Sequence, residues 1–215
     1  MQNPFRPSEL TALNPAPLET LTFMQKFLAP VTLSANQVRL EPLALRHEAG
    51  LRQAVQDGEL WKLRTSSAPA PENVAHYIQA ALNTRMAFAV VDETTGEIVG
   101  TTAFYQPDAD IRRVYIGYTW YRQSAWRTRI NSTCKYLLLV HAFETLDCRV
   151  VCWQTDILNT RSQAAIERLG AKKDGVLRCD KVRKDGTLRD TVAYSMLREE
   201  WAAAKRALAE KLATE

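Results

Sequence analysis

Residues 112–139 constrain the fold of this chain more than any other stretch, because they predict a strand, a basic loop and a helix in immediate succession. Val114–Trp120 alternates β-branched and aromatic residues around Gly117, which is typical of a strand with a close backbone approach at its middle. Residues 122–129 hold no aliphatic run, and apolar residues then recur at helical spacing over 134–142. The pattern therefore predicts a central strand that leads directly into a long helix.

The predicted N-terminus of this helix is a candidate anion site. Asn131, Ser132 and Thr133 are residue types that commonly cap a helix, and the basic loop precedes them. The first N–H groups of a helix lack intrahelical acceptors and lie at the positive end of the helix dipole. The junction of loop and helix therefore favours the binding of a phosphate group.

The remaining segments predict an α/β chain in which hairpins and helices follow one another. The final hairpin has the Asp185-Gly186 pair that favours a tight turn, and Gly170 stands where a glycine ends the preceding helix. The expected order is a strand hairpin (31–33 with 38–40), helices at 43–55 and 71–82, strands at 86–91 and 98–105, the central strand and its helix, a strand at 149–155, a helix at 161–169, the final hairpin (175–178 with 190–197) and a helix from 198.

Length and proline content indicate one domain with extensions at both ends. Residues 1–30 hold five prolines, which prevent a continuous helix, although 18–28 could form a short amphipathic one. We therefore expect an N-terminal arm over 1–30, a single domain over 31–201 and a helical tail over 202–215.

Composition excludes several classes of protein. A net charge of +4 is too mild to indicate nucleic-acid binding by itself, and no apolar run reaches the 18 residues that suggest a membrane span. The N-terminus shows no secretory signal. The four cysteines form no CxxC pair and the three histidines are scattered, so we expect reduced thiols, no metal site and a cytoplasmic location.

Four segments, in this order, resemble the core motifs of the GNAT superfamily of N-acetyltransferases, most closely its RimJ/RimL-like ribosomal-protein branch: RRVYIGYTW, WRTRINSTCKYLLLVHAFE, TDILNTRSQAAIERLGAKKDGVLR and DTVAYSMLREEW. The resemblance extends from about Pro30 to Trp201. It implies an α/β (α+β) GNAT fold, with a mixed, mostly antiparallel sheet of six to seven strands, splayed central strands and flanking helices. It also implies transfer of an acetyl group from acetyl-CoA to a primary amine, on a protein N-terminus or a small molecule, by direct attack in a ternary complex.

The resemblance also assigns candidate residues for cofactor binding. Backbone N–H groups of the loop and first helical turn would hold the CoA pyrophosphate, namely those of Arg127, Thr128, Arg129, Ile130, Asn131 and Ser132. Relatives usually carry glycines near positions 127 and 129. The two arginines either point outward or bind phosphate oxygens, or they are ordinary solvated loop residues.

The central strand is the candidate site for the thioester. Backbone N–H groups of Ile116, Gly117 and Tyr118 could hold the carbonyl oxygen of the acetyl group as it becomes negative. The alternative for Gly117 is an ordinary strand glycine against which an aromatic side chain packs.

Three further residues are candidates for catalysis. Within the segment Asp156-x-x-Asn159-x-x-Ser162, the resemblance implies that Asn159 anchors the pantetheine arm or a water and that Ser162 protonates the departing thiolate. Both could instead cap the helix that follows. Tyr115 stands where many relatives have a glutamate and is a poor base at neutral pH, so Asp156 is a reserve base, and proximity could supply most of the acceleration.

The acceptor itself cannot be named from these patterns. The resemblance makes the two helices over 43–82 one wall of its site, with Trp61, Arg64 and His76 as candidates, and a homodimer is plausible. Two other readings compete with catalysis. One is a degenerate module that binds CoA or acyl-CoA, and the other is nucleic-acid binding through Arg112, Arg113, Arg122, Arg127, Arg129 and Lys135.

Overall fold

The computed structural model describes residues 27–214. Most of the arm expected over 1–30, and the helix expected over 18–28, lie outside the described residues.

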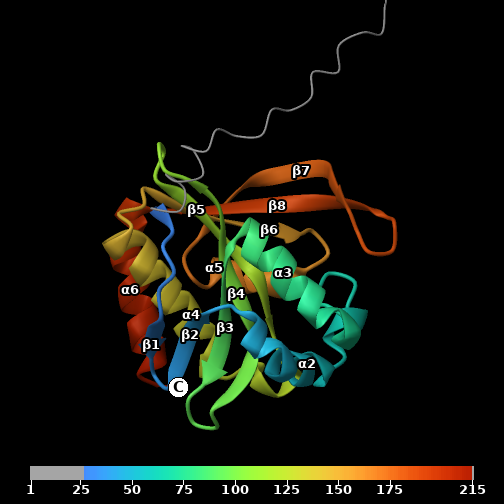
Figure 1. Cartoon of the computed structure of the whole chain (residues 1–215). Helices are drawn as coiled ribbons and strands as arrows, with labels where there is room; N and C mark the ends of the chain where they lie inside the picture. Colours follow the sequence, from blue (N-terminus) through green and yellow to red (C-terminus); the bar gives the residue numbers. More distant parts are fainter. Residues whose placement is uncertain (1–26, 215) are drawn as a thin grey trace, which may run out of the picture.

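One twisted sheet forms the centre of the molecule, in the order β1-β2-β3-β4-β5-β6-β8-β7 (Figure 1). It has eight strands rather than the six to seven that the resemblance implied, and they correspond to the eight segments that the sequence pattern predicted as strands. Every neighbouring pair is antiparallel except β5 with β6. The strands are β1 (Leu33–Ala35), β2 (Val38–Pro42), β3 (Met86–Asp92), β4 (Glu97–Asp108), β5 (Arg113–Tyr121), β6 (Val150–Asp156), β7 (Lys172–Val182) and β8 (Leu188–Leu197).

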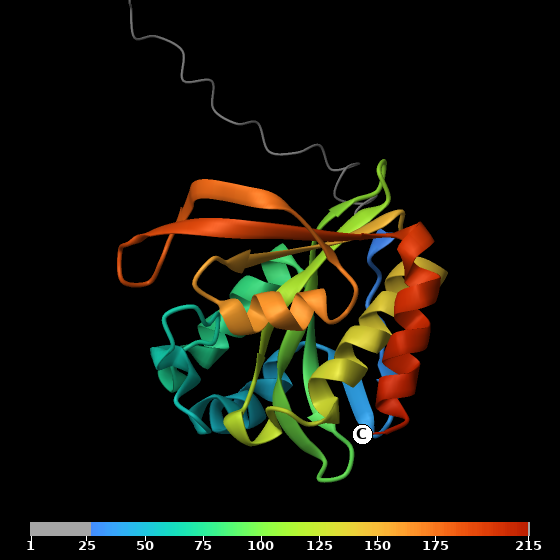
Figure 2. The same ribbon diagram turned by 180° about the vertical axis from the view of Figure 1, so that it is seen from behind.

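The helices cover the sheet on both faces and enclose two apolar clusters (Figures 1 and 2). The helices α2 and α3 cover one face, while α4, α5 and α6 cover the other. The α-helices are α2 (Glu48–Gln56), α3 (Val74–Thr84), α4 (Arg129–Val140), α5 (Thr160–Glu167) and α6 (Arg198–Leu212). Shorter turns are η1 (Leu45–His47), η2 (Leu60–Lys62), η3 (Pro71–Asn73), η4 (Gln123–Ala125) and the π-helical η5 (His141–Thr145).

The central strands splay apart, as the resemblance implied. Parallel pairing of β5 with β6 joins only three residue pairs and ends at Tyr115 with Cys152. Beyond that point β5 continues to Tyr121 without a partner on this side. A V-shaped gap therefore opens toward the carboxyl ends of two parallel strands, and such ends are where open α/β sheets bind ligands.

The start of α4 differs from the sequence-based expectation. The N-cap is Thr128, in an extended conformation, and its Oγ1 accepts from the N–H of Ile130 at 3.4 Å. Asn131, Ser132 and Thr133 lie inside the helix instead, and the last two are buried. The predicted helix start was too late, because Asn131, Ser132 and Thr133 are all residue types that commonly cap helices. The residue that caps the helix is Thr128, three residues before Asn131.

Residues 198–212 form one unbroken helix that shares the core of the domain. The Trp201 ring stacks on Phe143 with centroids 5.4 Å apart, and its Nε1 donates to Glu144 at 2.7 Å. Leu208 is also buried in the larger apolar cluster. The helix α6 is therefore packed against α4 and η5. Among residues 27–214, every helix is too short or too polar to cross a bilayer.

Candidate functional site

Two helix N-termini meet at the open end of the gap between β5 and β6. Because these strands are parallel, the loops that leave them lead to α4 and α5 on the same side. The guanidinium of Arg161, in the first turn of α5, lies 3.9 Å from the ring centre of Trp126, in the loop before α4. The side-chain cap of each helix takes one N–H group, that of Ile130 in α4 and that of Ser162 in α5. The other N–H groups of each first turn lack intrahelical acceptors and lie at the positive end of a dipole, so together they form a cradle suited to a diphosphate.

The cradle is strongly cationic. Arg127 lies close enough to Arg161 that, after burial, its charge is the second factor lowering the pKa of Arg161. Sequence reasoning missed Arg161, because only the fold brings it to the loop before α4. Two guanidinium groups that repel each other beside two helix N-termini provide a site for an anion that would relieve the repulsion.

The two arginines that replace family glycines play different parts. Arg127 is exposed and has φ +63°, a left-handed conformation that explains why glycine is usual there. The Arg129 side chain turns away from the loop, with Nη2 2.7 Å from Asp92 Oδ1 and Nε donating to the Asn36 carbonyl at 3.0 Å. It is therefore not an ordinary solvated arginine, and its backbone N–H remains in the first turn of α4.

The central strand is irregular where the thioester is expected. A Cβ at Gly117 would lie 2.7 Å from Cε1 of Tyr105, so the aromatic packing considered for this glycine is present. Tyr118 has φ +49° and lies at a register shift between β4 and β5. Its side chain is 41% exposed, on the side of the sheet that carries α3. The backbone of Ile116, Gly117 and Tyr118 borders the gap beyond the last β5–β6 pair.

Asn159 and Ser162 come together at the start of α5. Oδ1 of Asn159 accepts from the N–H of Ser162 at 3.0 Å, which makes Asn159 the N-cap. The capping role considered for Asn159 is therefore present, although its side-chain NH2 group is not used by this bond. The half-buried Ser162 lies in the first helical turn, where a developing thiolate would feel the helix dipole.

Asp156 is committed to an ion pair. Its carboxylate receives Nε and Nη2 of Arg183 at 2.6 and 2.8 Å and the N–H of Leu158 at 2.9 Å. The hydrogen bond from Arg183 is the main reason that the pKa of Asp156 is lowered. A carboxylate held in this way is poorly suited to collect a proton, which weakens its candidacy as reserve base.

Tyr115 occupies the last paired position before the gap opens. Its ring lies 5.3 Å from that of Tyr105, and burial, followed by the neighbouring Cys152 thiol, raises its pKa. A raised pKa leaves even less of this phenol deprotonated at neutral pH, so it is not available as a general base there and remains a hydrogen-bond donor.

Lys135 is a buried cation that sequence reasoning placed only in a surface patch. Its Nζ donates to the Thr119 hydroxyl at 2.8 Å and lies 3.4 Å from that of Thr102, both on the neighbouring strands. Burial lowers its pKa to about 8. Thr119 Oγ1 also lies 3.3 Å from the Gly117 carbonyl oxygen. Lys135 is therefore connected through the Thr119 hydroxyl to the irregular part of β5.

The residues proposed for a nucleic-acid surface do not form a free basic stripe. Four of the six are paired with carboxylates, and Lys135 is buried. The four pairs are Arg112–Asp147, Arg113–Asp108, Arg122–Glu97 and Arg129–Asp92. Only Arg127 of the six is exposed without a carboxylate partner among residues 27–214, which argues against a polyanion-binding face.

The hairpin between β7 and β8 contacts the loop before α3, which belongs to the expected acceptor wall. Nε of Arg64 pairs with Asp185 at 2.6 Å, and Nζ of Lys184 donates to the Ala68 carbonyl at 3.0 Å. The ion pair between Arg64 and Asp185 thus connects the loop before α3 to the tip of the hairpin. His76 lines a hollow beside Tyr118, and Trp61 packs against the smaller apolar cluster.

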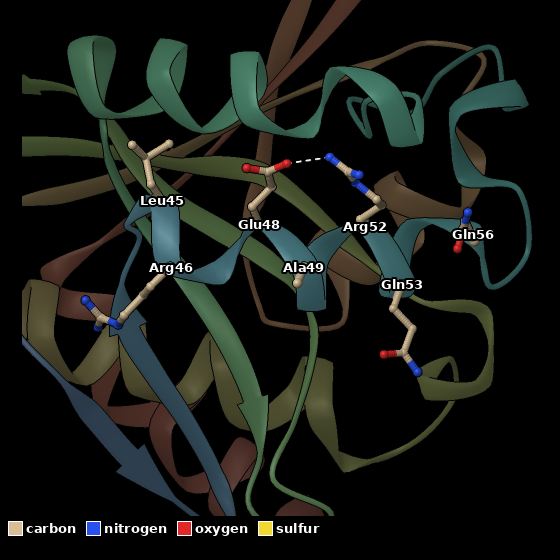
Figure 3. A pocket seen from close by; sticks show the side chains of 7 residues that line it. All are labelled: Leu45, Arg46, Glu48, Ala49, Arg52, Gln53 and Gln56. Carbon is tan, nitrogen blue, oxygen red and sulfur yellow. Dashed lines mark hydrogen bonds and ion pairs between the residues drawn. The ribbon is translucent and has the colours of Figure 1, made fainter.

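A second hollow lies along the outer side of α2, away from these residues (Figure 3). Its lining residues all come from 45–56, and Glu48 and Arg52, one helical turn apart, form an ion pair there. None of the residues predicted for the site lines it. Among residues 27–214, no three His, Cys, Asp or Glu side chains are grouped as metal ligands.

Known proteins resemble this chain in both sequence and structure. The family described as acetyltransferase (GNAT) domain matches residues 37–172. YdaF of Bacillus subtilis (strain 168), provisionally named a ribosomal N-acetyltransferase, is 30% identical over 106 residues, which is 49% of this chain and 57% of that relative.

Solved structures agree over most of the described fold. A provisionally named acetyltransferase from T. thermophilus is 34% identical, with a TM-score of 0.76 over 86% of this chain and 98% of the other. A GCN5-related N-acetyltransferase from Brucella melitensis is 26% identical, with a TM-score of 0.78 over 86% of each chain.

Proposed function

This chain belongs to the GNAT acetyltransferase family, and from that premise we propose that it transfers the acetyl group of acetyl-CoA to a primary amine. One observation carries the proposal: β5 and β6 part after Tyr115 and Cys152, and the N-termini of α4 and α5 meet at the open end. A flexible arm that ends in a thioester fits the gap, while the diphosphate that precedes this arm in CoA fits the cradle.

The cradle would bind CoA through main-chain and side-chain donors together. N–H groups from Arg127 to Ser132 would contact the diphosphate, with Arg127 and Arg161 supplying charge. The side-chain NH2 of Asn159 would hold the pantetheine arm. The backbone N–H groups of Ile116, Gly117 and Tyr118 would replace the missing β6 partner with hydrogen bonds to the arm and the acetyl oxygen.

Transfer would take place in a ternary complex. The amine nitrogen forms a bond to the acetyl carbon, the carbon–sulfur bond breaks, and Ser162 gives its proton to the departing thiolate and recovers one from solvent. Tyr115, protonated because its pKa is raised, would donate a hydrogen bond beside the reacting carbonyl. The proton of the amine leaves to water, and proximity supplies most of the acceleration.

The acceptor class is a protein N-terminus or a small-molecule amine. The Bacillus relative named a ribosomal N-acetyltransferase supports the first, but the chain aligns with only 57% of that protein's length. The hollow beside Tyr118 supports either, since it opens at the strand where the thioester would lie.

Release of free thiol tests the proposal. Purified protein with acetyl-CoA and a panel of peptides and small amines should release CoA, detected by a thiol reagent, while calorimetry measures CoA binding separately. CoA binding without thiol release from any amine would contradict catalysis and support the second candidate, a module that only binds CoA. The absence of the usual glycines at Arg127 and Arg129 favours that candidate.

Location and assembly are further proposals. We infer a cytoplasmic protein, supported by four cysteines that are all unpaired. A homodimer is supported by Val182 and Leu188, which are 68% and 61% exposed on the β7–β8 hairpin. Light scattering at several concentrations would give the mass, and a monomer at all of them would exclude the dimer.

A further inference from the structure

The acceptor side of the sheet contains a hollow of about 480 Å³ beside the irregular part of β5. It lies between α3, the loop that precedes α3, and the exposed ring of Tyr118. Tyr118 follows Gly117, where β5 has already parted from β6. A molecule bound here would approach the gap from the α3 side, opposite the face covered by α4 (Figure 1).

Arg85 is the charged group of this hollow, and its charge is not neutralised. Its guanidinium carbon lies 3.9 Å from the ring centre of Tyr118 and 5.2 Å from that of Tyr77. Nη1 donates to Thr84 Oγ1 at 3.1 Å, but the buried Nε has no hydrogen-bond acceptor. No carboxylate within residues 27–214 pairs with it. Stacking thus fixes the plane of a guanidinium while leaving donors unused.

A second arginine acts on the same group of tyrosines. The charge of Arg189, on β8, acts on the phenol of Tyr105, whose ring meets that of Tyr118 at 5.2 Å between centroids. The Nε of Arg189 is also buried without an acceptor. The charge of Arg189 also acts on the Asp156 carboxylate, so Arg85 is the cation beside Tyr118 that pairs with no carboxylate among residues 27–214.

Carboxylates of β6 and of the β7–β8 hairpin already have hydrogen-bond partners. Asp156 is held by Arg183, Asp185 by Arg64 at 2.6 Å, and Asp190 accepts from the N–H of Cys179 at 2.8 Å. No Asp or Glu is among the residues that line the hollow. The wall that meets the acceptor is therefore cationic, and it would repel acceptors that carry several positive charges, such as polyamines and aminoglycosides.

We propose that the acceptor carries a side-chain carboxylate near its amine, which Arg85 binds while stacked on Tyr118. A planar guanidinium with free donors matches a carboxylate with two parallel hydrogen bonds. This inference rests on the proposed acetyl transfer and narrows it. The chemistry fits a peptide N-terminus followed by acidic residues, or a free amino acid with an acidic side chain.

Acceptors that differ only in charge distinguish a peptide from a free amino acid as the acceptor. One set consists of peptides of equal length that begin with serine, followed by two Glu, two Gln or two Lys residues. The other set consists of free glutamate and free glutamine. For each acceptor we would measure kcat/KM from thiol release and, by calorimetry, binding to the CoA-loaded protein. We expect the acidic peptide or free glutamate to exceed its neutral partner by about 10- to 100-fold, the range for hydrogen bonds to a charged group. The acidic acceptor with the higher kcat/KM shows whether the protein acts on a peptide or on a free amino acid.

Variants at Arg85 test the residue itself. Arg85→Met should remove most of the acidic preference, Arg85→Lys should retain part of it, and both should bind CoA as the wild type does. Arg52→Met, on the outer side of α2, is the matched control and should leave the preference intact. CoA binding and thermal unfolding verify that each variant is folded.

Two results would overturn the inference without touching acetyl transfer: equal use of acidic, neutral and basic acceptors, or an acidic preference that survives Arg85→Met. Absence of thiol release with every acceptor would instead count against the proposed function. The calorimetric comparison then still decides this inference, because tighter binding of an acidic than of a neutral acceptor is required.

Discussion

Replacing Lys135 by methionine tests how the interface between α4 and the sheet is built. The lysine is 7% exposed, and its ammonium donates to the hydroxyls of Thr119 and Thr102. Burial lowers its pKa from 10.5 to about 8. Methionine keeps an unbranched side chain of similar length without the charge, so Lys135→Met should raise the free energy of unfolding at pH 7.

Proton linkage gives the size and sign of this effect. The unfolded chain holds the Lys135 proton up to a pKa of 10.5, while the folded chain loses it near 8, so between these values the unfolded state binds more protons and stability rises with pH. The full difference is about 3 kcal/mol, at about 1.4 kcal/mol for each pKa unit. About 2 kcal/mol of this is recovered between pH 7 and pH 9.5.

Urea unfolding of both proteins at pH 7 and pH 9.5 measures the effect. The advantage of Lys135→Met should shrink by about 2 kcal/mol at the higher pH. Comparing the two proteins cancels other groups, such as Cys148 and Cys152, whose raised pKa of about 11 acts in the opposite direction. Lys62→Met, at an exposed site, should show no such change. A difference that stays constant with pH would show that burial does not lower the pKa of Lys135.

Three further substitutions test the site. Because Arg127 has φ +63°, Arg127→Gly should be about 1 kcal/mol more stable in urea than Arg127→Ala, and both should bind CoA equally weakly; equal stability would exclude backbone strain. Ser162→Ala should lower kcat about 100-fold while the Kd for CoA holds, and an unchanged kcat would remove the serine from catalysis. Gly117→Ala should cost about 1–3 kcal/mol in thermal unfolding, since its Cβ would lie 2.7 Å from Tyr105; Tyr105→Leu in the same chain should reduce that cost, and no reduction would show that another contact is responsible.

Local signals in the sequence predicted the elements well, because each depends on neighbouring residues. Alternation over 114–120 marked β5, Asp185-Gly186 marked the turn before β8, and Gly170 has the left-handed φ of +93° expected after α5. The order and splay of the central strands came from the resemblance and are confirmed.

The partners of charged side chains could not be predicted in the same way. Arg129 pairs with Asp92, 37 residues away, and Arg161 meets Trp126 only because α4 and α5 start at the same end of the gap. Arg85 and Lys135 carry no local motif. Their roles depend on burial and on the absence of a nearby carboxylate, which are properties of the fold.

A crystal structure of the protein with CoA would show whether the cofactor occupies the gap and the cradle. We expect the diphosphate between the first turns of α4 and α5, within hydrogen-bond distance of N–H groups from Arg127 to Ser132, and the pantetheine arm beside Ile116, Gly117 and Tyr118 in the gap. CoA bound elsewhere on the protein, or a gap that remains empty at saturating CoA, would contradict this expectation.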